Sequence, residues 1–556
     1  MDNGRWLELI RAMEARGIDR RTFLRLVGGT AGAASLAALP SHTLAGSPSE
    51  AHAVLSASLQ EPKPGGTLVY ARDGDADSLD PHKTTTTLSW QVQGQLFDTL
   101  VAFDANGNVQ PNLAKSWDIS EDGTQYTFHL QEGVTFHDGT PLNAEAVKFT
   151  FDRFVAPETS NPSKASIGPL TATEVVDELT ARLTFEAPFA PLLSFLTDQF
   201  AGIVSPTAVQ QHGNEFGNNP VGSGPFKFKE WVKGDRIVLD RFDGYKGFHP
   251  MYQHQGPAYL DQVLFRAMPE EQARLAALET GEVTMAEPPL EEVERLQNDD
   301  TFAVHIAPST GQLVFFEFAL HRPPFDDERV RKAVGFGVDR EAIVDIALNG
   351  LVQPVQCTVG PGILGGESAV CGEAGFTYDP EQAKALLKEA GYGDKPLAVT
   401  LATWTGGNRE DVAQLIQNQL NQVGFDVKLE TMDIGTLNAR VKQENTTPEG
   451  AGFFDMMGWA WFDPDILYAL FHSPGWVEGY SDPELDKMLE DQRRTTDREE
   501  RLAKVDAIQR FILERAAMVP LYSPGWNWIL AAQSKMQGFQ FAPFNRALLY
   551  DVYLAE

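Results

Sequence analysis

Cysteine and positive charge are both scarce in this chain of 556 residues. Only two residues are cysteines, and 45 lysines and arginines stand against 77 aspartates and glutamates, which gives a formal net charge of −32. Two cysteines are too few for a zinc or iron–sulfur site built from cysteine ligands. A strongly acidic surface repels phosphate backbones and anionic lipid headgroups. The composition therefore argues against nucleic-acid binding as the main activity and against electrostatic attachment to a membrane.

The N-terminal region, residues 1–53, has the pattern of an export signal. A weakly apolar stretch of 14 residues, "LVGGTAGAASLAAL", follows the paired arginines Arg20 and Arg21. A membrane-spanning helix needs about 20 strongly apolar residues, so this stretch is too short to be one. Paired arginines before such a stretch resemble a twin-arginine signal, and Ala51 and Ala53 fit a cleavage site. The prediction is a periplasmic or otherwise extracytoplasmic protein; the alternative is a cytosolic chain with a basic amphipathic N-terminal helix.

The two cysteines, Cys357 and Cys371, lie far from this signal. Neither can therefore carry a lipid anchor at the start of the cleaved chain. In an oxidising compartment, they are candidates for a disulfide across the Gly/Pro-rich loop between them. Two free buried thiols are the alternative.

Sequence motifs of catalysis are also missing. The chain has no glycine-rich phosphate loop ending in Lys-Ser/Thr, and the "VGSGPF" segment at 221–226 lacks the spacing of a nucleophile elbow. His249 and His254 are five residues apart, a separation that matches neither one helical face nor a familiar pair of metal ligands. We therefore predict no enzyme, no metal site and no cofactor.

The length predicts at least two domains, because single hydrophobic cores stop growing at about 250–300 residues. Alternating apolar residues predict strands, and amphipathic patterns with capping residues predict long helices between and after them. This mixture indicates α/β lobes. The expected strands are 67–72, 126–130, 236–242 and 426–430, and the expected helices lie at about 380–390, after "PPFDDERVRKAV" and near 497–515.

Several phrases, in order along the chain, resemble the extracytoplasmic solute-binding proteins of family 5, which serve ATP-binding-cassette importers for oligopeptides, dipeptides and nickel. The resemblance covers essentially the whole chain after the signal. The phrases are "SLDPH" (78–82), "LFDTLVAFD" (96–104), "LAKSWDISEDGTQYTFHLQEGVTFHDGTPLNAEAVKFTFDR" (113–153), "GSGPFKFKEW" (222–231), "RPPFDDERVRKAVGFGVDREAIV" (322–344), "YDPEQAKALLKEAGY" (378–392), "GWAWFDPD" (458–465) and "VPLY" (519–522).

The resemblance implies a bilobal periplasmic-binding-protein-like fold of type II with an extra inserted subdomain. Two α/β lobes would close around a solute by a hinge motion, and the closed form would deliver the solute to the membrane permease. The protein would act as a monomer, with a small, peptide-like solute and the permease subunits as its partners. The implied ranges are 65–100, 218–318 and 515–556 for lobe I, 101–217 for its inserted subdomain, and 319–514 for lobe II.

The resemblance also implies the residues that meet the solute. In peptide-binding relatives, two short backbone stretches pair with the extended ligand like added strands. These stretches fall on Thr85, Thr86 and Thr87, and on Gly458, Trp459 and Ala460. Trp404 and Trp461 would add aromatic walls. Core packing is the alternative for the tryptophans, and a solvated loop is the alternative for the threonines.

One departure from the family pattern concerns the acidic anchor for a peptide's ammonium group. Peptide-binding relatives carry an aspartate a few residues after the Gly-Trp pair, with a longer loop before Asp-Pro. Here the loop is about two residues shorter, so Asp463 is the remaining candidate; the alternative is that Asp463 serves the Asp-Pro turn and does not reach the ligand. An unpaired buried ammonium is costly, and the solute could equally be a modified peptide, a glycoside or a metal chelate. An exported enzyme or a sensor on the same fold stays open as an alternative function.

Overall fold

The computed structural model of the protein describes residues 62–308, 311–406, 408–446, 452–473, 476, 480–524 and 529–555. The chain from Pro62 onward forms one compact unit. The predicted export signal, residues 1–53, lies outside the described residues.

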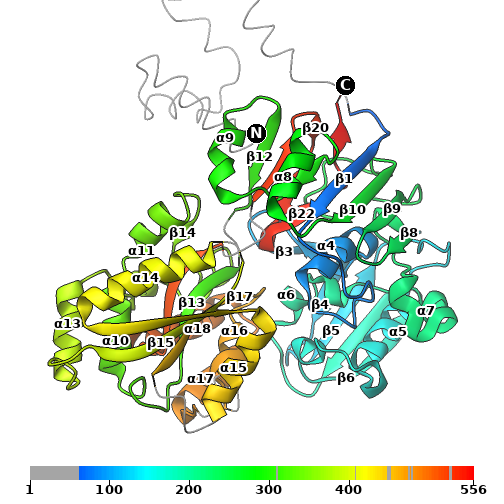
Figure 1. Ribbon diagram of the computed structural model, residues 1–556. Coiled ribbons are helices and arrows are strands. Elements are labelled where there is room, and N and C mark those ends of the chain that lie inside the picture. The colour runs from blue at the N-terminus through cyan, green and yellow to red at the C-terminus, as the bar shows by residue number, and fades with distance from the viewer. Residues whose placement is uncertain are drawn as a thin grey trace, which may run out of the picture. The chain divides into compact units, whose positions relative to one another are not determined.

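The first lobe is built on a mixed sheet of seven strands in the order β12–β19–β11–β1–β10–β9–β8 (Figure 1). Strand β1 runs parallel to β10 and β11, and the remaining neighbours are antiparallel. The bounds are β1 (Thr67–Arg72), β8 (Phe226–Val232), β9 (Arg236–Arg241), β10 (Gln262–Ala267), β11 (Met285–Ala286), β12 (Phe302–Ile306) and β19 (Ile529–Gln533).

Three helices pack against this sheet: α4 (Thr87–Leu96) on β8, α8 (Glu271–Glu279) on β11 and α9 (Val293–Gln297) on β12. The strands predicted at 67–72 and 236–242 are confirmed as β1 and β9. In β1, Leu68, Tyr70 and the adjacent Ala71 are all buried, because a central strand is covered on both faces.

Residues 101–217 contain a separate antiparallel sheet in the order β4–β5–β7–β6. The strand predicted at 126–130 is confirmed as β5 of this sheet. Helix α5 (Ala144–Val155) packs on β6 and β7 and buries Val147, Phe151 and Phe154. The strand bounds are β4 (Ala114–Ile119), β5 (Gln125–Leu130), β6 (Leu170–Asp177) and β7 (Thr180–Phe185), with a hairpin of β2 (Val101–Phe103) and β3 (Val109–Pro111) before them.

The second lobe is built on a mixed sheet of six strands in the order β14–β18–β13–β17–β15–β16. Strand β15 runs parallel to β16 and β17, whereas β13 is antiparallel to β17 and β18. The strand predicted at 426–430 is confirmed as β16. The bounds are β13 (Gln312–Phe318), β14 (Gln353–Pro354), β15 (Leu397–Trp404), β16 (Phe425–Met432), β17 (Phe453–Ala460) and β18 (Met518–Ser523).

The helices of this lobe form two groups (Figure 1). Helices α10, α13 and α14 contact one another, and α14 also contacts β15 and β16; α16 packs on α17, and α18 on α17 and β18. All three predicted helices are confirmed, as α10, α13 and α18. The bounds are α10 (Glu328–Gly337), α13 (Pro380–Glu389), α14 (Arg409–Val423), α16 (Ile466–Phe471), α17 (Pro483–Arg494) and α18 (Arg498–Glu514), with α12 (Ala369–Ala374) packed on α18 and α15 (Ile434–Thr446) on β15.

Two strands belong to the other lobe than the one the resemblance implies. The implied ranges place β13 and β18 in lobe I, next in sequence to β12 and β19. Both strands instead pair with each other in the six-stranded sheet of the second lobe. By sheet membership, the chain therefore changes lobe between Ile306 and Gln312 and again between Ser523 and Ile529.

The structure joins Cys357 and Cys371 in a disulfide. Both residues are buried, and the bridge closes a loop with a sequence separation of 14 residues. Helix α12 contains Cys371, so the bridge ties this loop to the helix that packs on α18.

Candidate ligand-binding cleft

The carboxyl ends of four strands meet at one edge of the six-stranded sheet. Strands β15, β16 and β17 run parallel, and β18 has the same direction because it is separated from β17 by the antiparallel β13. In open α/β sheets, ligands bind just outside the carboxyl ends of the strands. Trp404 ends β15, Gly458, Trp459 and Ala460 end β17, and Tyr522 lies near the end of β18.

Aromatic rings cluster at this edge. Trp459 makes edge-to-face contacts with Trp461, at a centroid distance of 6.2 Å, and with Trp476, at 5.5 Å. Trp461 in turn contacts Phe195 at 5.8 Å, a residue of the segment 101–217. These rings connect the second lobe to the inserted segment.

A small cavity of about 90 Å³ is lined by residues from both lobes. The expected residues Thr87 and Ala460 both line it, which brings together one member of each predicted backbone stretch. Its other lining residues include Trp90, Asp98, His249, Gln312, Phe462, Phe544 and Arg546.

A second, larger hollow of about 820 Å³ lies next to this cavity, and Phe103 and Phe462 line both. The ring of Phe544 contacts both of these phenylalanines, with centroid distances of 5.5 Å to Phe103 and 4.3 Å to Phe462. Ligand pockets for small molecules measure about 300–1,000 Å³. The larger hollow has the size for a solute, and it shares the lining residues Phe103 and Phe462 with the smaller cavity.

Phe544 adopts a backbone conformation that non-glycine residues rarely adopt, with φ of 65°. Such conformations cost about 1–3 kcal/mol and persist where the surroundings hold them, most often at functional sites. Phe544 packs directly on Gly311, where an added Cβ would collide with its ring. A strained aromatic residue thus lies beside the point where the chain changes lobe.

Two titratable side chains of the first lobe, Asp98 and His249, line the cavity. The carboxylate of Asp98 accepts hydrogen bonds from the Tyr245 hydroxyl at 3.0 Å and the Ser223 hydroxyl at 3.1 Å. Burial nevertheless raises the pKa of Asp98 to about 7. Burial lowers the pKa of His249 to about 3, with a further contribution from the positive charge of Arg546. At neutral pH, His249 is therefore uncharged and Asp98 is close to its titration midpoint.

The threonine run has two different environments. Thr87 begins α4 and lines the cavity, whereas Thr86 uses its hydroxyl to donate to Asp77 at 2.8 Å. Thr85 is exposed. Among the described residues that line the small cavity, Thr87 is the only one of the three threonines.

Asp463 lines the larger hollow and is also part of a buried ion pair. It is 2% exposed, and its two carboxylate oxygens accept from both terminal nitrogens of Arg501. Arg501 also contacts Gln492, which donates to Asp465 at 2.9 Å. The Asp-Pro turn is thereby fixed to α17 and α18. Both members of this ion pair, Asp463 and Arg501, line the larger hollow.

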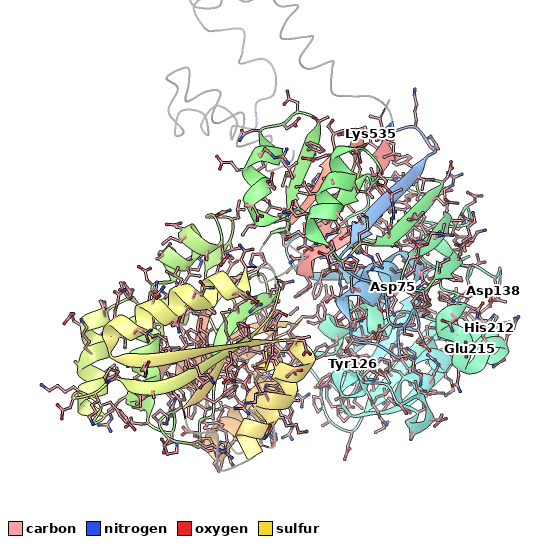
Figure 2. The ribbon with its side chains drawn as sticks, viewed as in Figure 1. Asp75, Tyr126, Asp138, His212, Glu215 and Lys535 are labelled. Carbon is pink, nitrogen blue, oxygen red and sulfur yellow. A yellow bond between two sulfur atoms is a disulfide. The ribbon has the colours of Figure 1, made fainter. Side chains whose placement is uncertain are left out.

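The same region holds the inserted segment against the second lobe. The Ala190 amide donates to the Arg493 carbonyl at 2.7 Å, and the Arg493 guanidinium lies 5.1 Å from the Phe189 ring. Tyr126 of β5, labelled in Figure 2, donates its hydroxyl to the Phe189 carbonyl at 3.2 Å. These contacts join the four-stranded sheet to the end of α17.

Comparison with known proteins places this arrangement in a family. The model of the bacterial extracellular solute-binding proteins of family 5 matches residues 108–478. The chain belongs to this family. The glutathione-binding protein GsiB of Pectobacterium atrosepticum is 32% identical to it over 492 residues, which cover 86% of this chain and 92% of the relative.

Relatives of this family-5 protein whose structures have been solved share its bilobal fold. The periplasmic binding protein DppA of Helicobacter pylori, solved with the peptide STSA, is 29% identical, with a TM-score of 0.73 and coverage of 89% of this chain and 99% of that chain. The binding protein AgaA of A. tumefaciens, solved with agropinic acid, is 26% identical, with a TM-score of 0.72 and coverage of 88% and 99%. Among the helices in the described part of this family-5 protein, none is long and apolar enough to cross a membrane.

Sequence reasoning missed most of the first lobe's contribution to the cleft. Asp98 lies inside the quoted phrase "LFDTLVAFD" but gave no sign of burial, and His249 was considered only as a metal ligand. Phe544 and Arg546 lie in the C-terminal segment, where no motif was quoted. The fold brings residues 98, 249 and 544 together at the cavity. Residues so far apart in the chain share no sequence pattern that would predict this.

Proposed function

We propose that this family-5 protein captures a peptide-like solute between its two lobes and delivers it to the permease of an ATP-binding-cassette importer. The observation that carries the proposal is that both lobes line the small cavity, through Thr87 and Ala460, and the larger hollow beside it, through Phe103 and Phe462. The larger hollow has the size for a solute. A ligand that contacts both lobes stabilises the arrangement in which they meet, because it gains contacts available in no other arrangement.

The class of solute follows from the site and from the relatives. The aromatic edge of Trp404, Trp459 and Trp461 suits side chains of varied shape, and strand ends offer backbone groups to an extended ligand. The names of GsiB and of the DppA complex identify glutathione and a tetrapeptide as ligands of those proteins. A peptide of two to four residues is the solute that we propose here.

The proposed site comprises Thr87, Trp404, Gly458, Trp459, Ala460 and Trp461. The proposed lobes follow sheet membership, with lobe I at about 65–306 and 529–556, the inserted subdomain at 101–217 within it, and lobe II at about 312–523. The protein acts as a monomer without cofactor or catalysis, and it is exported by a twin-arginine signal with cleavage near Ala53.

Calorimetric titration of the mature protein with glutathione and with the peptide Ser-Thr-Ser-Ala tests the proposal. We expect saturable binding at one site and recovery of the unaltered solute by mass spectrometry. Ala460→Trp should abolish binding, because the new ring fills the cavity. Ala276→Trp, at an exposed position of α8, is the matched control and should bind normally.

Two results would contradict the proposal. Conversion of the solute would favour an exported enzyme. Absence of binding across di-, tri- and tetrapeptides, together with binding of an opine such as agropinic acid, would assign the protein to a non-peptide solute.

A further inference from the structure

Two amide side chains of the inserted segment line the small cavity with oxygen atoms to which no described group donates a hydrogen bond. Asn112, between β3 and β4, is 2% exposed. Its amide nitrogen donates to the Thr99 carbonyl at 3.0 Å, whereas its amide oxygen has no partner among the described residues. The amide oxygen of Gln199, the first residue of the short helix η4 (Gln199–Ala201), is likewise buried without a partner in the described part of the chain. Most buried acceptors in native proteins have partners, so two exceptions in one cavity indicate a ligand.

The same cavity contains a carboxyl group whose charge no described residue balances. Asp98 is 8% exposed, and it accepts hydrogen bonds from the uncharged hydroxyls of Tyr245 and Ser223. Arg546 also lines the cavity, but its guanidinium is paired with the buried carboxylate of Asp198 at 2.6 Å. The lining therefore carries one unbalanced negative charge when Asp98 is ionised.

These three acceptors are the complement of an ammonium group, which has a positive charge and three N–H donors but no acceptor. Asp98 would balance the charge, and the amide oxygens of Asn112 and Gln199 would accept the remaining donors. Hydrogen bonds of this kind satisfy buried acceptors that would otherwise be costly.

A fourth group of the lining narrows the choice of ligand. The indole nitrogen of Trp90, on α4, is buried at the cavity and has no hydrogen-bond partner among the described residues. An indole N–H can only donate, so it suits an oxygen atom close to the ammonium. A metal ion would leave this donor without a partner. An ammonium group one carbon away from a carbonyl oxygen is the amino terminus of a peptide.

The size of the cavity limits what can enter it. A volume of about 90 Å³ accommodates one end of a solute and not a whole peptide. The larger hollow of about 820 Å³ shares Phe103 and Phe462 with this cavity, and it has room for the remainder of the chain. One extended solute can therefore occupy both spaces.

We propose that the small cavity binds the amino-terminal ammonium group of the transported peptide through Asp98, Asn112 and Gln199, and that the protein thereby selects solutes with a free amino terminus. The inference rests on the proposed function, because it assigns the orientation of the peptide-like solute. It also places an acidic anchor in the first lobe, in a protein whose aspartate after the Gly-Trp pair, Asp463, already has Arg501 as a charged partner.

Two matched ligand pairs test the selectivity in the unaltered protein. Ser-Thr-Ser-Ala is compared with the same peptide carrying a hydroxypropanoyl group in place of its first serine, and glutathione with glutaryl-cysteinyl-glycine. Each second compound lacks only the amino group, so no added bulk excludes it from the cavity. By calorimetric titration, we expect the mature protein to bind at least one amino form about tenfold or more tightly than its desamino partner, the difference typical of hydrogen bonds to a charged group.

Two substitutions test the residues. Asparagine has the shape of the carboxyl group without its charge, so Asp98→Asn should bind the amino and desamino forms with affinities within about threefold of each other. Gln199→Met removes the amide oxygen with little change in length. This variant should bind the amino form about threefold or more weakly and the desamino form unchanged.

Asp551→Asn is the matched control for the loss of a buried carboxylate in the first lobe. The carboxylate of Asp551 accepts from the Gln253 amide at 3.0 Å and contacts the His254 ring at 2.7 Å. This variant should keep the preference for the amino form. Melting temperatures without solute show whether each variant folds.

Proton release on binding tests the contact with Asp98 directly. Burial raises the pKa of Asp98 to about 7, and a bound ammonium lowers it again, because an opposite charge favours the ionised form. The neighbouring groups do not titrate near pH 7, since burial raises the pKa of Tyr245 and Tyr252 and lowers the pKa of His249 to about 3. Arg546 is charged throughout this range.

Titrations at pH 7 in two buffers of different ionisation enthalpy measure the protons released. Binding of the amino form to the unaltered protein should release about half a proton per solute. The desamino form should release none, and neither form should release protons on binding to Asp98→Asn. A residue with a merely structural role would not produce this difference.

The outcomes separate the two proposals. Equal binding of amino and desamino forms by the unaltered protein, or a preference that survives in Asp98→Asn, would overturn the ammonium site and leave the proposed function standing. A lower melting temperature of Asp98→Asn with unchanged selectivity and unchanged proton release would make Asp98 structural and overturn its role. Binding of neither peptide nor glutathione in any form would overturn both proposals together.

Discussion

At the scale of single residues, the second lobe contains a buried pair of acids. Glu317 of β13 and Asp455 of β17 are register partners on adjacent strands, and they are 4% and 2% exposed. Glu317 accepts a hydrogen bond from the indole nitrogen of Trp476 at 3.0 Å. Burial raises the pKa of Glu317 to about 8, and burial together with the charge of Glu317 raises the pKa of Asp455 well above its usual range. The pair therefore holds protons at neutral pH.

This pair predicts a loss of stability as the pH rises. A carboxyl group whose pKa is raised in the folded state binds its proton more tightly there than in the unfolded chain. Its stabilising contribution is complete below the unfolded pKa of about 4.5 and is lost as the pH rises through about 8. Glu317→Gln should raise the melting temperature at pH 8.5 and flatten the decline of the melting temperature between pH 5 and 8.5.

Calorimetry at a series of pH values measures this effect. Glu158→Gln, at an exposed position, should leave the pH profile unchanged. An unaltered profile in Glu317→Gln would show that the Glu317 carboxyl group does not carry the effect.

The ion pair of Asp463 and Arg501 predicts a separation of stability from binding. Removing one partner of a buried pair leaves an uncompensated charge and costs about 3–5 kcal/mol. Asp463→Asn should therefore lower the free energy of unfolding by several kcal/mol in denaturant titrations, while the dissociation constant for the solute at 25 °C stays the same. Weaker binding with unchanged stability would instead return Asp463 to the ligand site.

Single residues were the hardest level to predict from sequence. Trp404, Trp459 and Trp461 were expected at the cleft and lie at the sheet edge, because a resemblance can carry a position along the chain. The burial of Asp98 depends on the segments that the fold packs around it, and sequence does not record that packing. The ion pair of Asp463 is not predictable from sequence for the same reason, since Arg501 lies 38 residues away.

At the scale of elements, the sequence predicts a helix well when the residues that fix its ends are neighbours in the chain. The helix at 380–390 was predicted from Asp379, Pro380 and Gly391, and in α13 the Asp379 side chain does accept from the Gln382 amide at 2.9 Å. The membership of β13 and β18 in the second lobe was not predictable in this way. Their apolar sequences identify strands, but pairing partners more than 100 residues away decide which sheet they join.

The disulfide predicts redox-sensitive stability of one loop. Closing a loop of this length contributes about 3 kcal/mol in the chain-entropy model. Reduction should lower the melting temperature, and the protein with Cys357→Ser and Cys371→Ser should melt at that lower temperature with or without reductant. Scanning calorimetry with and without dithiothreitol measures the difference. Equal melting temperatures of the oxidised and reduced protein would show that the loop is held by its packing alone.

At the scale of the whole molecule, the approach of the lobes depends on a glycine in the β2–β3 hairpin. Gly107 has φ of 75°, and an added Cβ would lie 2.5 Å from the Gly362 carbonyl oxygen of the second lobe. Gly107→Ala should therefore weaken solute binding by about tenfold or more, since it opposes the contact between the lobes. Small-angle scattering should show a larger radius of gyration.

A matched variant separates this steric effect from backbone strain. Gly133 has φ of 68°, and no atom lies within 4 Å of an added Cβ there. Gly133→Ala carries the same conformational penalty, about 1 kcal/mol, and should bind the solute normally. Equal losses of affinity in the two variants would assign the effect to backbone strain and not to the contact with Gly362.

The seven-stranded sheet joins the two ends of the described chain: β11 pairs on one side with β1, near residue 70, and on the other with β19, near residue 531. During synthesis, β1 leaves the ribosome several hundred residues before β19 exists. The first lobe can be completed only once β19 has been synthesised, so its earlier strands need protection from aggregation until that strand is available.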